Sequence, residues 1–445
     1  MDENEIRVLF EHLARAERPP TAVDIALARS VGARRRRVKR AMIPAMSAGA
    51  LATAATLIVT VPLPFGLFGP GGPAAGLCAD GSHGRGPAAG PSAASAASVA
   101  YVANSFSGTV TPIKTADSRA GKAIRVGGAP AEIAVTPDGK TAYVASNGIG
   151  AVPGTVTPIS TATNKAGKAI KVAAGHSFVF IAVTPDGKTV YAGDYRTGTV
   201  TPISTVTNTA GKAITVGKGP HAIAVTPDGK TAYVANNGSD TVTPISTATN
   251  AACNAITVGQ NPAAIAVTPD GKTAYVANYG SDTVTPISTA TNAAGNAITV
   301  GKNPAAIAIT PDGKTAYVLL DSTDSVTPIN TATNKAGKTI RVDSTQQGAM
   351  AVTPNGKTIY VLSFGLSTFS SSTFIVTPIS TVTKTAGKAI KVGEDPTSIA
   401  ITPNGRTVYV TNYASNTVTP INTVTYTAGK AIKVGEAPNA IVITP

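Results

Sequence analysis

The sequence has little of several residue types on which enzymes and cofactor proteins depend. Its 445 residues include two cysteines, four histidines and no tryptophan, and aromatic residues make up 5% of the chain. Cys78 and Cys253 provide neither a disulfide framework nor a metal motif, so we expect two unpaired thiols. Gly-x-Ser-x-Gly and Cys-x-x-Cys-His motifs are absent. We therefore expect no cofactor and no metal, and catalysis has little support.

Nucleic acid is also an improbable ligand on composition. The formal net charge is +14, but aromatic side chains do not alternate with the lysines, and such side chains are what single-stranded nucleic acids stack on. The positive charge therefore needs another explanation.

What the chain does contain is a repeat. Thr-Pro, then Asp or Asn, Gly, and Lys or Arg, recurs about every 42 residues, and this spacing is typical of a solenoid or a propeller. Each unit reads as four short apolar or alternating runs separated by turn residues, such as AIAV, TAYVAN, TVTPIST and AITV. Four strands per unit predict an all-β fold, a β-propeller of four-stranded blades, because a helical repeat would place apolar residues at 3.6-residue spacing.

The residue types of each unit predict local structure. Pro-Asp-Gly predicts a hairpin turn between the first two strands, with glycine in the left-handed conformation. A tyrosine recurs in the second strand and a Thr-Pro dipeptide in the third. Since proline has no N–H to donate, we expect the fourth strand to pair loosely beside it and leave the third strand partly an edge.

The number and phase of the repeats predict how the ring closes. Each strand type can be counted eight times, and the first recognisable element, residues 98–104, has the sequence of a second strand. The last, residues 439–445, has the sequence of a first strand. Pairing these two ends would remove exposed strand edges. We predict eight blades, seven of them continuous and one made of both chain ends, with seven blades as the alternative.

Several of the second strands carry a family resemblance. The letters YVAN at 101–104, 233–236 and 275–278, and YVTN at 409–412, resemble the YVTN repeat of surface-layer and related extracytoplasmic propellers. The resemblance covers residues 98–445 and implies a propeller at the bacterial cell envelope. Such families are often seven-bladed, so the count of eight departs from what the resemblance implies. It does not imply an activity, because propellers host many functions.

The first hundred residues differ from the rest in composition. We interpret 1–40 as a short helical, basic cytoplasmic tail, 41–62 as one transmembrane helix, 63–97 as a linker rich in Gly, Pro, Ala and Ser, and 98–445 as the propeller. The basic run at 34–40 predicts a cytoplasmic N-terminus and an extracellular propeller. A cleaved signal peptide, which would make the protein secreted, is the alternative.

Lysines recur in the predicted turns between first and second strands. In an antiparallel blade, these turns share one face of the disc with the turns between third and fourth strands, whereas the remaining loops, richer in Asp and Glu, share the other face. A face of one charge sign attracts an anionic surface, here membrane lipid or an acidic wall polymer. The alternative is that the lysines only keep the surface soluble. The cations of the first set of turns are Lys140, Lys188, Lys230, Lys272, Lys314, Lys357 and Arg406.

Two further sets of residues are candidates for function. His221 and Glu132 lie near the start of first strands, where they would face the mouth of the central channel. Phe364, Phe369 and Phe374 belong to an insertion on the acidic face. Contact with an envelope protein partner and filling of an expanded blade are equally compatible with it.

Two function classes follow. The first, which we favour, is a monomeric binding or scaffolding module at the cell envelope. The second is a hydrolase or lyase of lactonase type with its site at the channel mouth.

Overall fold

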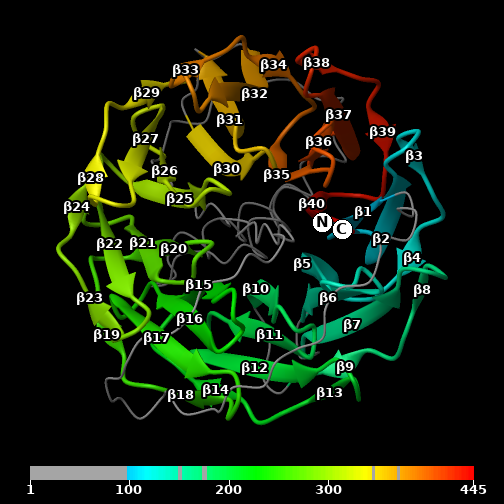
Figure 1. Cartoon of the computed structure of the whole chain (residues 1–445). Helices are drawn as coiled ribbons and strands as arrows, with labels where there is room; N and C mark the ends of the chain where they lie inside the picture. Colours follow the sequence, from blue (N-terminus) through cyan, green and yellow to red (C-terminus); the bar gives the residue numbers. More distant parts are fainter. Residues whose placement is uncertain (1–97, 149–152, 173–177, 343–345, 368–370) are drawn as a thin grey trace, which may run out of the picture. The chain divides into compact units, whose positions relative to one another are not determined.

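Eight antiparallel sheets form a ring, as Figure 1 shows. The protein is described by a computed structural model that covers residues 98–148, 153–172, 178–342, 346–367 and 371–445. The prediction of an eight-bladed all-β propeller is confirmed. We number the blades I to VIII along the chain. Their inner strands, nearest the centre of the ring, are in that order β40 (Pro438–Ile443), β5 (Ala129–Val135), β10 (Phe178–Val183), β15 (Pro220–Val225), β20 (Pro262–Val267), β25 (Pro304–Ile309), β30 (Gln346–Val352) and β35 (Pro396–Ile401).

The second and third strands of each blade form a continuous antiparallel ladder, and the second strand is buried on both faces. The second strands are β1 (Val99–Asn104), β6 (Thr141–Asn147), β11 (Thr189–Asp194), β16 (Thr231–Asn236), β21 (Thr273–Asn278), β26 (Thr315–Leu320), β31 (Thr358–Ser367) and β36 (Thr407–Asn412). The third strands are β2 (Thr109–Lys114), β7 (Thr155–Ser160), β12 (Thr199–Ser204), β17 (Thr241–Ser246), β22 (Thr283–Ser288), β27 (Ser325–Asn330), β32 (Ser371–Ser380) and β37 (Thr417–Asn422).

The outer strand of every blade is split into two dipeptides. In blade III, β12 pairs with β13 through Ile203 and Ser204, and with β14 through Thr199 and Val200, so the ladder is interrupted around Pro202. Because proline has no N–H, this confirms the loose pairing expected beside it. The dipeptides are β3 (Arg119–Ala120), β4 (Ile124–Arg125), β8 (Lys165–Ala166), β9 (Ile170–Lys171), β13 (Thr209–Ala210), β14 (Ile214–Thr215), β18 (Ala251–Ala252), β19 (Ile256–Thr257), β23 (Ala293–Ala294), β24 (Ile298–Thr299), β28 (Lys335–Ala336), β29 (Ile340–Arg341), β33 (Thr385–Ala386), β34 (Ile390–Lys391), β38 (Thr427–Ala428) and β39 (Ile432–Lys433).

The two ends of the propeller sequence close the ring. β40 pairs with β1 in antiparallel register, with Val102 opposite Ile441. Two hydrogen bonds extend the contact, from the N–H of Val99 to Oγ1 of Thr444 and from the N–H of Thr444 to the carbonyl of Val99, each 2.9 Å. Blade I is therefore built from both chain ends, as the phase of the repeats predicts.

Neighbouring blades are joined through the tyrosines of the second strands. All eight are at most 1% exposed. In six of them the hydroxyl reaches the fourth residue of the turn between the third and outer strands of the next blade, a contact that we call the tyrosine latch. The latched pairs are Tyr101–Asn164 (2.7 Å), Tyr143–Asn208 (2.8 Å), Tyr191–Asn250 (2.6 Å), Tyr233–Asn292 (2.5 Å), Tyr275–Asn334 (2.6 Å) and, from blade VIII to blade I, Tyr409–Ser118 (2.9 Å).

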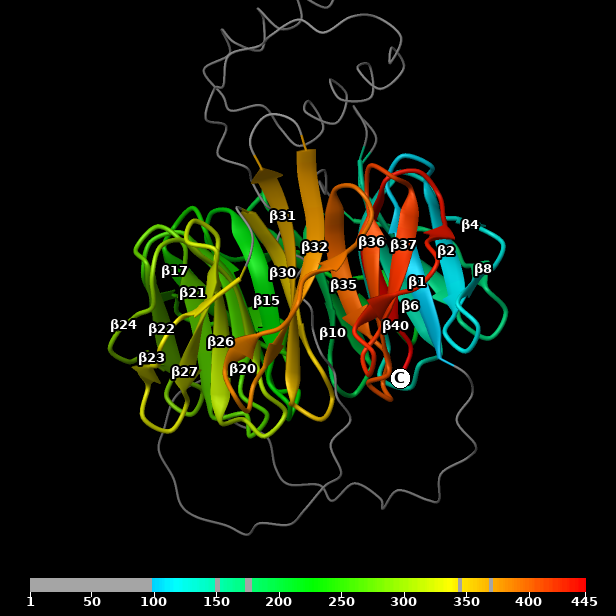
Figure 2. The same ribbon diagram turned by 90° about the horizontal axis from the view of Figure 1, so that it is seen from above.

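The insertion in blade VII lengthens a hairpin instead of forming an irregular loop. β31 and β32 span ten residues each, against six in most other blades. Figure 2 shows this hairpin extending beyond its neighbours. Phe364 and Phe374 are paired across it, whereas Phe369 lies outside the described residues.

Two expectations depend on parts of the chain beyond the ring. Cys253 is disulfide-bonded, so the expectation of two unpaired thiols is wrong for this residue, and Cys78 lies outside the described residues. The predicted cytoplasmic tail (1–40), membrane helix (41–62) and linker (63–97) also lie outside them. Within the described part, no helix is long and apolar enough to cross a membrane.

Candidate functional site

The turn between inner and second strands engages its carboxylate in hydrogen bonds and leaves its lysine side chain exposed. In blade IV, Oδ1 of Asp228 accepts hydrogen bonds from Oγ1 of Thr226 (2.6 Å) and from the N–H of Lys230 (3.1 Å). Gly229 takes a φ of 73°, in the left-handed region that the predicted turn requires. Lys230 contributes only its backbone to the turn, and its side chain is exposed. The sequence of the turn therefore presents a lysine to solvent.

The electrostatics of these turns follow from the same contacts. In blade VI, the hydrogen bond from Thr310 lowers the pKa of Asp312, and the N–H and charge of Lys314 act in the same direction. Together they outweigh burial, which raises this pKa. The carboxylate is therefore ionised and engaged within the turn.

Both sets of predicted turns lie on one side of the ring, which we call the turn face. In blade II, Thr161 starts the turn to the outer strand, and its N–H donates to the carbonyl of Lys140 (3.0 Å). The cations Lys140, Lys188, Lys230, Lys272, Lys314, Lys357 and Arg406 are all exposed there. Among these seven, only Lys140 forms an ion pair, at 3.5 Å from Asp138, within the described residues.

Acidic residues on the opposite face connect loops of neighbouring blades. Asp240 and Asp282 take positive φ angles in the turns between second and third strands. Their carboxylates accept hydrogen bonds from the N–H groups of Asn261 (2.8 Å) and Asn303 (2.9 Å). These two acidic side chains therefore hold neighbouring loops together, and this role does not depend on a partner at this face.

His221 and Glu132 lie on inner strands, but two blades apart. His221 is half-buried at a bulge of β15, and its Nδ1 lies 2.9 Å from the carbonyl oxygen of Ala263 in the next blade. Burial lowers the pKa of His221, opposed by this hydrogen bond. Glu132 is half-buried in β5, and burial raises the pKa of its carboxyl to about 8. Across the described residues, no hydrogen bond or ion pair joins the two side chains.

Two of the eight junctions lack the tyrosine latch, which the repeat pattern did not predict. Lys384 and Tyr426 occupy the positions that hold asparagine in most blades, and both keep the positive φ of those asparagines. The hydroxyl of Tyr360, which would reach position 426, is buried without a hydrogen-bond partner. The hydroxyl of Tyr317, which would reach position 384, also lacks one in the described structure. In the sequence, the replacement of asparagine by Lys384 and Tyr426 was the feature that could have indicated these two breaks.

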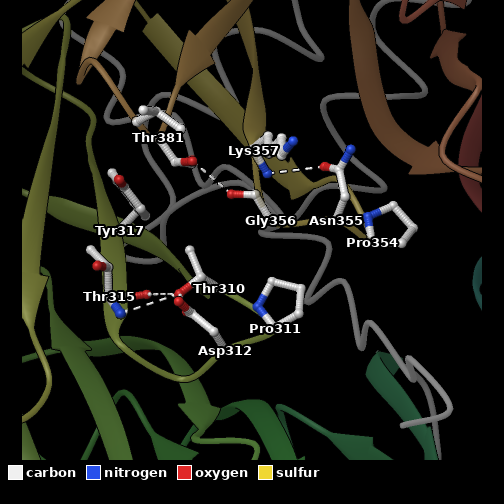
Figure 3. A pocket seen from close by; sticks show the side chains of 11 residues that line it. Thr310, Pro311, Asp312, Thr315, Tyr317, Pro354, Asn355, Gly356, Lys357 and Thr381 are labelled. Carbon is white, nitrogen blue, oxygen red and sulfur yellow. Dashed lines mark hydrogen bonds between the residues drawn. The ribbon is translucent and has the colours of Figure 1, made fainter. Parts of the chain in front are cut away.

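A pocket of about 510 Å³ opens at the junction of blades VI and VII, where Lys384 replaces asparagine. Figure 3 shows the residues that line it, which come from the turn face of both blades. They are Thr310, Pro311, Asp312, Thr315, Tyr317, Pro354, Asn355, Gly356, Lys357, Thr381 and Val382.

Comparison with known proteins identifies the protein family of this chain. The sequence matches the family described as Lactonase, 7-bladed beta-propeller, in overlapping segments 118–244, 188–288, 213–346 and 328–432. The chain belongs to this family. It has eight blades where the family's description has seven, in agreement with the repeat count. No curated protein matches the sequence.

Solved structures agree on the fold of this family member. Kuenenia stuttgartiensis hydrazine synthase is similar with a TM-score of 0.52 and 26% identity, over 58% of this chain and 87% of that one. The dihydro-heme d1 dehydrogenase NirN gives a TM-score of 0.64 at 16% identity, over 77% and 74%. Citrobacter koseri AztD gives 0.58 at 12% identity, over 78% and 97%. The last two likenesses show the propeller fold alone.

Within the described residues, no group of three or more His, Cys, Asp or Glu side chains is placed to hold a metal ion. The turn face of the described part of the propeller presents seven exposed turn cations, five of which share their turn with an aspartate whose carboxylate is hydrogen-bonded within that turn.

Proposed function

We propose that this propeller is a binding module at the cell envelope, with its turn face against an anionic membrane surface. The supporting observation is the ring of seven exposed turn cations, of which six have no ion-pair partner among the described residues. A field of one sign summed over a face attracts an opposite surface, and each nearby Lys or Arg contributes about 1 kcal/mol at an anionic membrane.

The site where the chain enters the ring agrees with this orientation. The carbonyl of Ser98, the first described residue, accepts a hydrogen bond from the N–H of Thr115, at the start of a turn on the turn face. A tether from a membrane helix would therefore meet the propeller on its cationic side. The opposite face, with the long β31–β32 hairpin, would point outward to a protein partner.

Vesicle binding tests the proposal. The propeller, residues 98–445 with Cys253 replaced by glycine as in most blades, should sediment with phosphatidylglycerol vesicles but not with phosphatidylcholine vesicles. High salt should release it, because such attraction is screened beyond about 10 Å. Charge reversal of Lys140, Lys230, Lys272 and Lys314 to Glu should abolish binding without unfolding, since their side chains do not build the turns.

The matched control moves the same charge change elsewhere. Reversal of Lys171, Arg341, Lys391 and Lys433, all exposed on outer strands, changes the net charge equally but spares the turn face. This control should bind within about twofold of the unmodified propeller. Equal loss in both variants, or equal binding to neutral vesicles, would show that the turn face has no special role. Binding to acidic wall polymer but not to vesicles would identify the polymer as the partner.

The membrane anchor has its own test. Mass spectrometry of the mature protein should find the basic residues 34–40 still attached. A mature N-terminus beyond about residue 70 would instead make this a secreted protein, and the tethered orientation would have no basis.

Membership of the lactonase propeller family supports a second candidate, hydrolysis at the channel mouth. Glu132 and His221, both on inner strands, are the titratable residues for it. Hydrolysis of a panel of lactones that is lost in both Glu132→Gln and His221→Ala would favour this candidate over a binding module. Hydrolysis that survives both variants would assign the activity to other residues.

A further inference from the structure

The pocket between blades VI and VII exists where the repeat departs from its own pattern. At six other junctions the tyrosine hydroxyl is engaged by a side chain of the next blade. At this junction Tyr317 is 1% exposed, yet its hydroxyl has no protein partner in the described structure and lines the pocket. A buried hydroxyl without a hydrogen bond is costly unless water or a ligand meets it.

The asparagine is also lost at the junction of blades VII and VIII, but there the tyrosine hydroxyl is enclosed. There Tyr426 takes the asparagine position, and the hydroxyl of Tyr360 is enclosed, with no accessible surface of its own. Lys384 instead belongs to the same exposed turn as Thr381 and Val382, which line the open pocket. The lysine therefore brings a positive charge to the place of a neutral acceptor.

The pocket lining is rich in hydrogen-bond donors. Asn355 stands where five other blades have aspartate, and its Oδ1 is used by the N–H of Lys357 (3.0 Å) and by Oγ1 of Thr353 (2.7 Å). Its amide nitrogen remains a donor, and Lys357 and Lys384 have no ion-pair partner among the described residues. The only carboxylate of the lining, Asp312, is already held by Thr310 and by the N–H of Lys314.

We propose that this pocket binds a phosphate group. The tetrahedral oxygens of phosphate accept hydrogen bonds from several directions, which suits the Tyr317 hydroxyl, the Asn355 amide and the Lys357 ammonium of the lining. Charge-assisted hydrogen bonds are the strong ones, and Lys384, on the same turn as Thr381 and Val382, adds a positive charge beside the lining. The volume of about 510 Å³ lies within the range of small-ligand sites and leaves room for the group that carries the phosphate. This site adds recognition of one phosphate-bearing group to the surface attraction proposed above, and it does not depend on that attraction.

Calorimetric titration of the full-length protein with inorganic phosphate and with glycerol 3-phosphate is the direct test. Lys384→Asn restores the residue that latches other blades, so it should remove the charge, close the pocket and weaken phosphate binding at least tenfold. Its thermal midpoint should be unchanged or higher, because Tyr317 gains an acceptor. Tyr317→Phe should weaken phosphate binding severalfold.

Lys388→Asn is the matched control, since Lys388 is exposed beyond the same turn and the charge change is identical. It should bind phosphate within about twofold of the unmodified protein. Equal losses in Lys384→Asn and Lys388→Asn would overturn the proposal, because charge alone would then explain binding. Unchanged affinity in Lys384→Asn, or no binding of either phosphate compound, would overturn it too.

Two further experiments distinguish phosphate binding in this pocket from vesicle binding by the turn face, and identify the source of the phosphate. A variant with Lys140, Lys188, Lys230 and Lys272 reversed to Glu, none of which lines the pocket, should keep phosphate binding while losing vesicle binding, so that failure of one proposal leaves the other intact. In this same variant, whose turn face no longer attracts anionic vesicles, vesicles containing phosphatidic acid should compete with glycerol 3-phosphate if lipid is a source. Vesicles with an equal charge of oleate should not, and competition by both would overturn the assignment to phosphate.

Discussion

The eight buried tyrosines allow the same substitution to be tested in three environments. We expect it to lower the free energy of unfolding in one, raise it in another and leave it almost unchanged in the third. Tyr191, Tyr317 and Tyr360 are equivalent second-strand residues, and each is 0–1% exposed. Replacement by phenylalanine keeps the ring and removes only the hydroxyl. Differences between the three variants therefore report what each hydroxyl contacts.

The magnitudes follow from those contacts. The hydroxyl of Tyr191 donates to Oδ1 of Asn250 at 2.6 Å, so its loss should lower the free energy of unfolding by about 1 kcal/mol, the usual net value of a hydrogen bond. The hydroxyl of Tyr360 is buried without a partner, and its removal should raise that free energy by about 1 kcal/mol. The hydroxyl of Tyr317 faces an open pocket, so we expect a change within about 0.5 kcal/mol.

Urea unfolding and differential scanning calorimetry measure these changes. For a domain of this size, 1 kcal/mol corresponds to a midpoint shift of about 1–3 °C, so Tyr191→Phe and Tyr360→Phe should differ by about 2–6 °C. Tyr426→Asn, which offers Tyr360 the usual acceptor, should also stabilise the protein. If the three phenylalanine variants shift in the same direction by the same amount, the latch does not account for the role of the hydroxyls.

Two further predictions concern ring closure and pH. Removing the last nine residues deletes β40, including Ile441, which is 4% exposed. Loss of its burial and strand pairing should lower the free energy of unfolding by at least about 5 kcal/mol, so the chain should unfold at a much lower urea concentration. The control substitution Val206→Asp, at a residue 79% exposed, should change the urea midpoint little. A truncated chain with a nearly unchanged midpoint would mean that the ring is not held by this pairing. Burial raises the pKa of Glu132 from its ordinary value of 4.5 to about 8. The folded state therefore retains a proton that the unfolded state loses, and stability falls as pH rises between those values. Glu132→Gln should therefore unfold at higher temperature than the unmodified protein at pH 8 and show a smaller gain at pH 5; a gain independent of pH would contradict the buried, protonated carboxyl.

The repeated letters of the sequence determined most of the fold. Each repeat is one sheet unit, so its strands depend on residues close together in the chain. Pro-Asp-Gly sets the turn, and Pro202 and its equivalents split the outer strand, because both effects are local to the backbone. The exposure of the turn lysines, such as Lys230, follows from the same local geometry. The number of blades followed from the repeat count, and the closing pair from its phase.

The tertiary structure alone decided which residues of different blades meet. Tyr191 and Asn250 are separated by 59 positions, and no local pattern links a strand residue to a turn in the next repeat. The sequence also does not distinguish Lys384 from other surface lysines. Its place in the fold does, because the unpartnered hydroxyl of Tyr317 lies beside the turn that carries it. Burial raises the pKa of Glu132 because the ring packs inner strands around it, and Cys253 is disulfide-bonded although its spacing gives no sign of it. Local backbone geometry is encoded within one repeat, whereas contacts between repeats depend on the packing of surfaces that only the closed ring brings together.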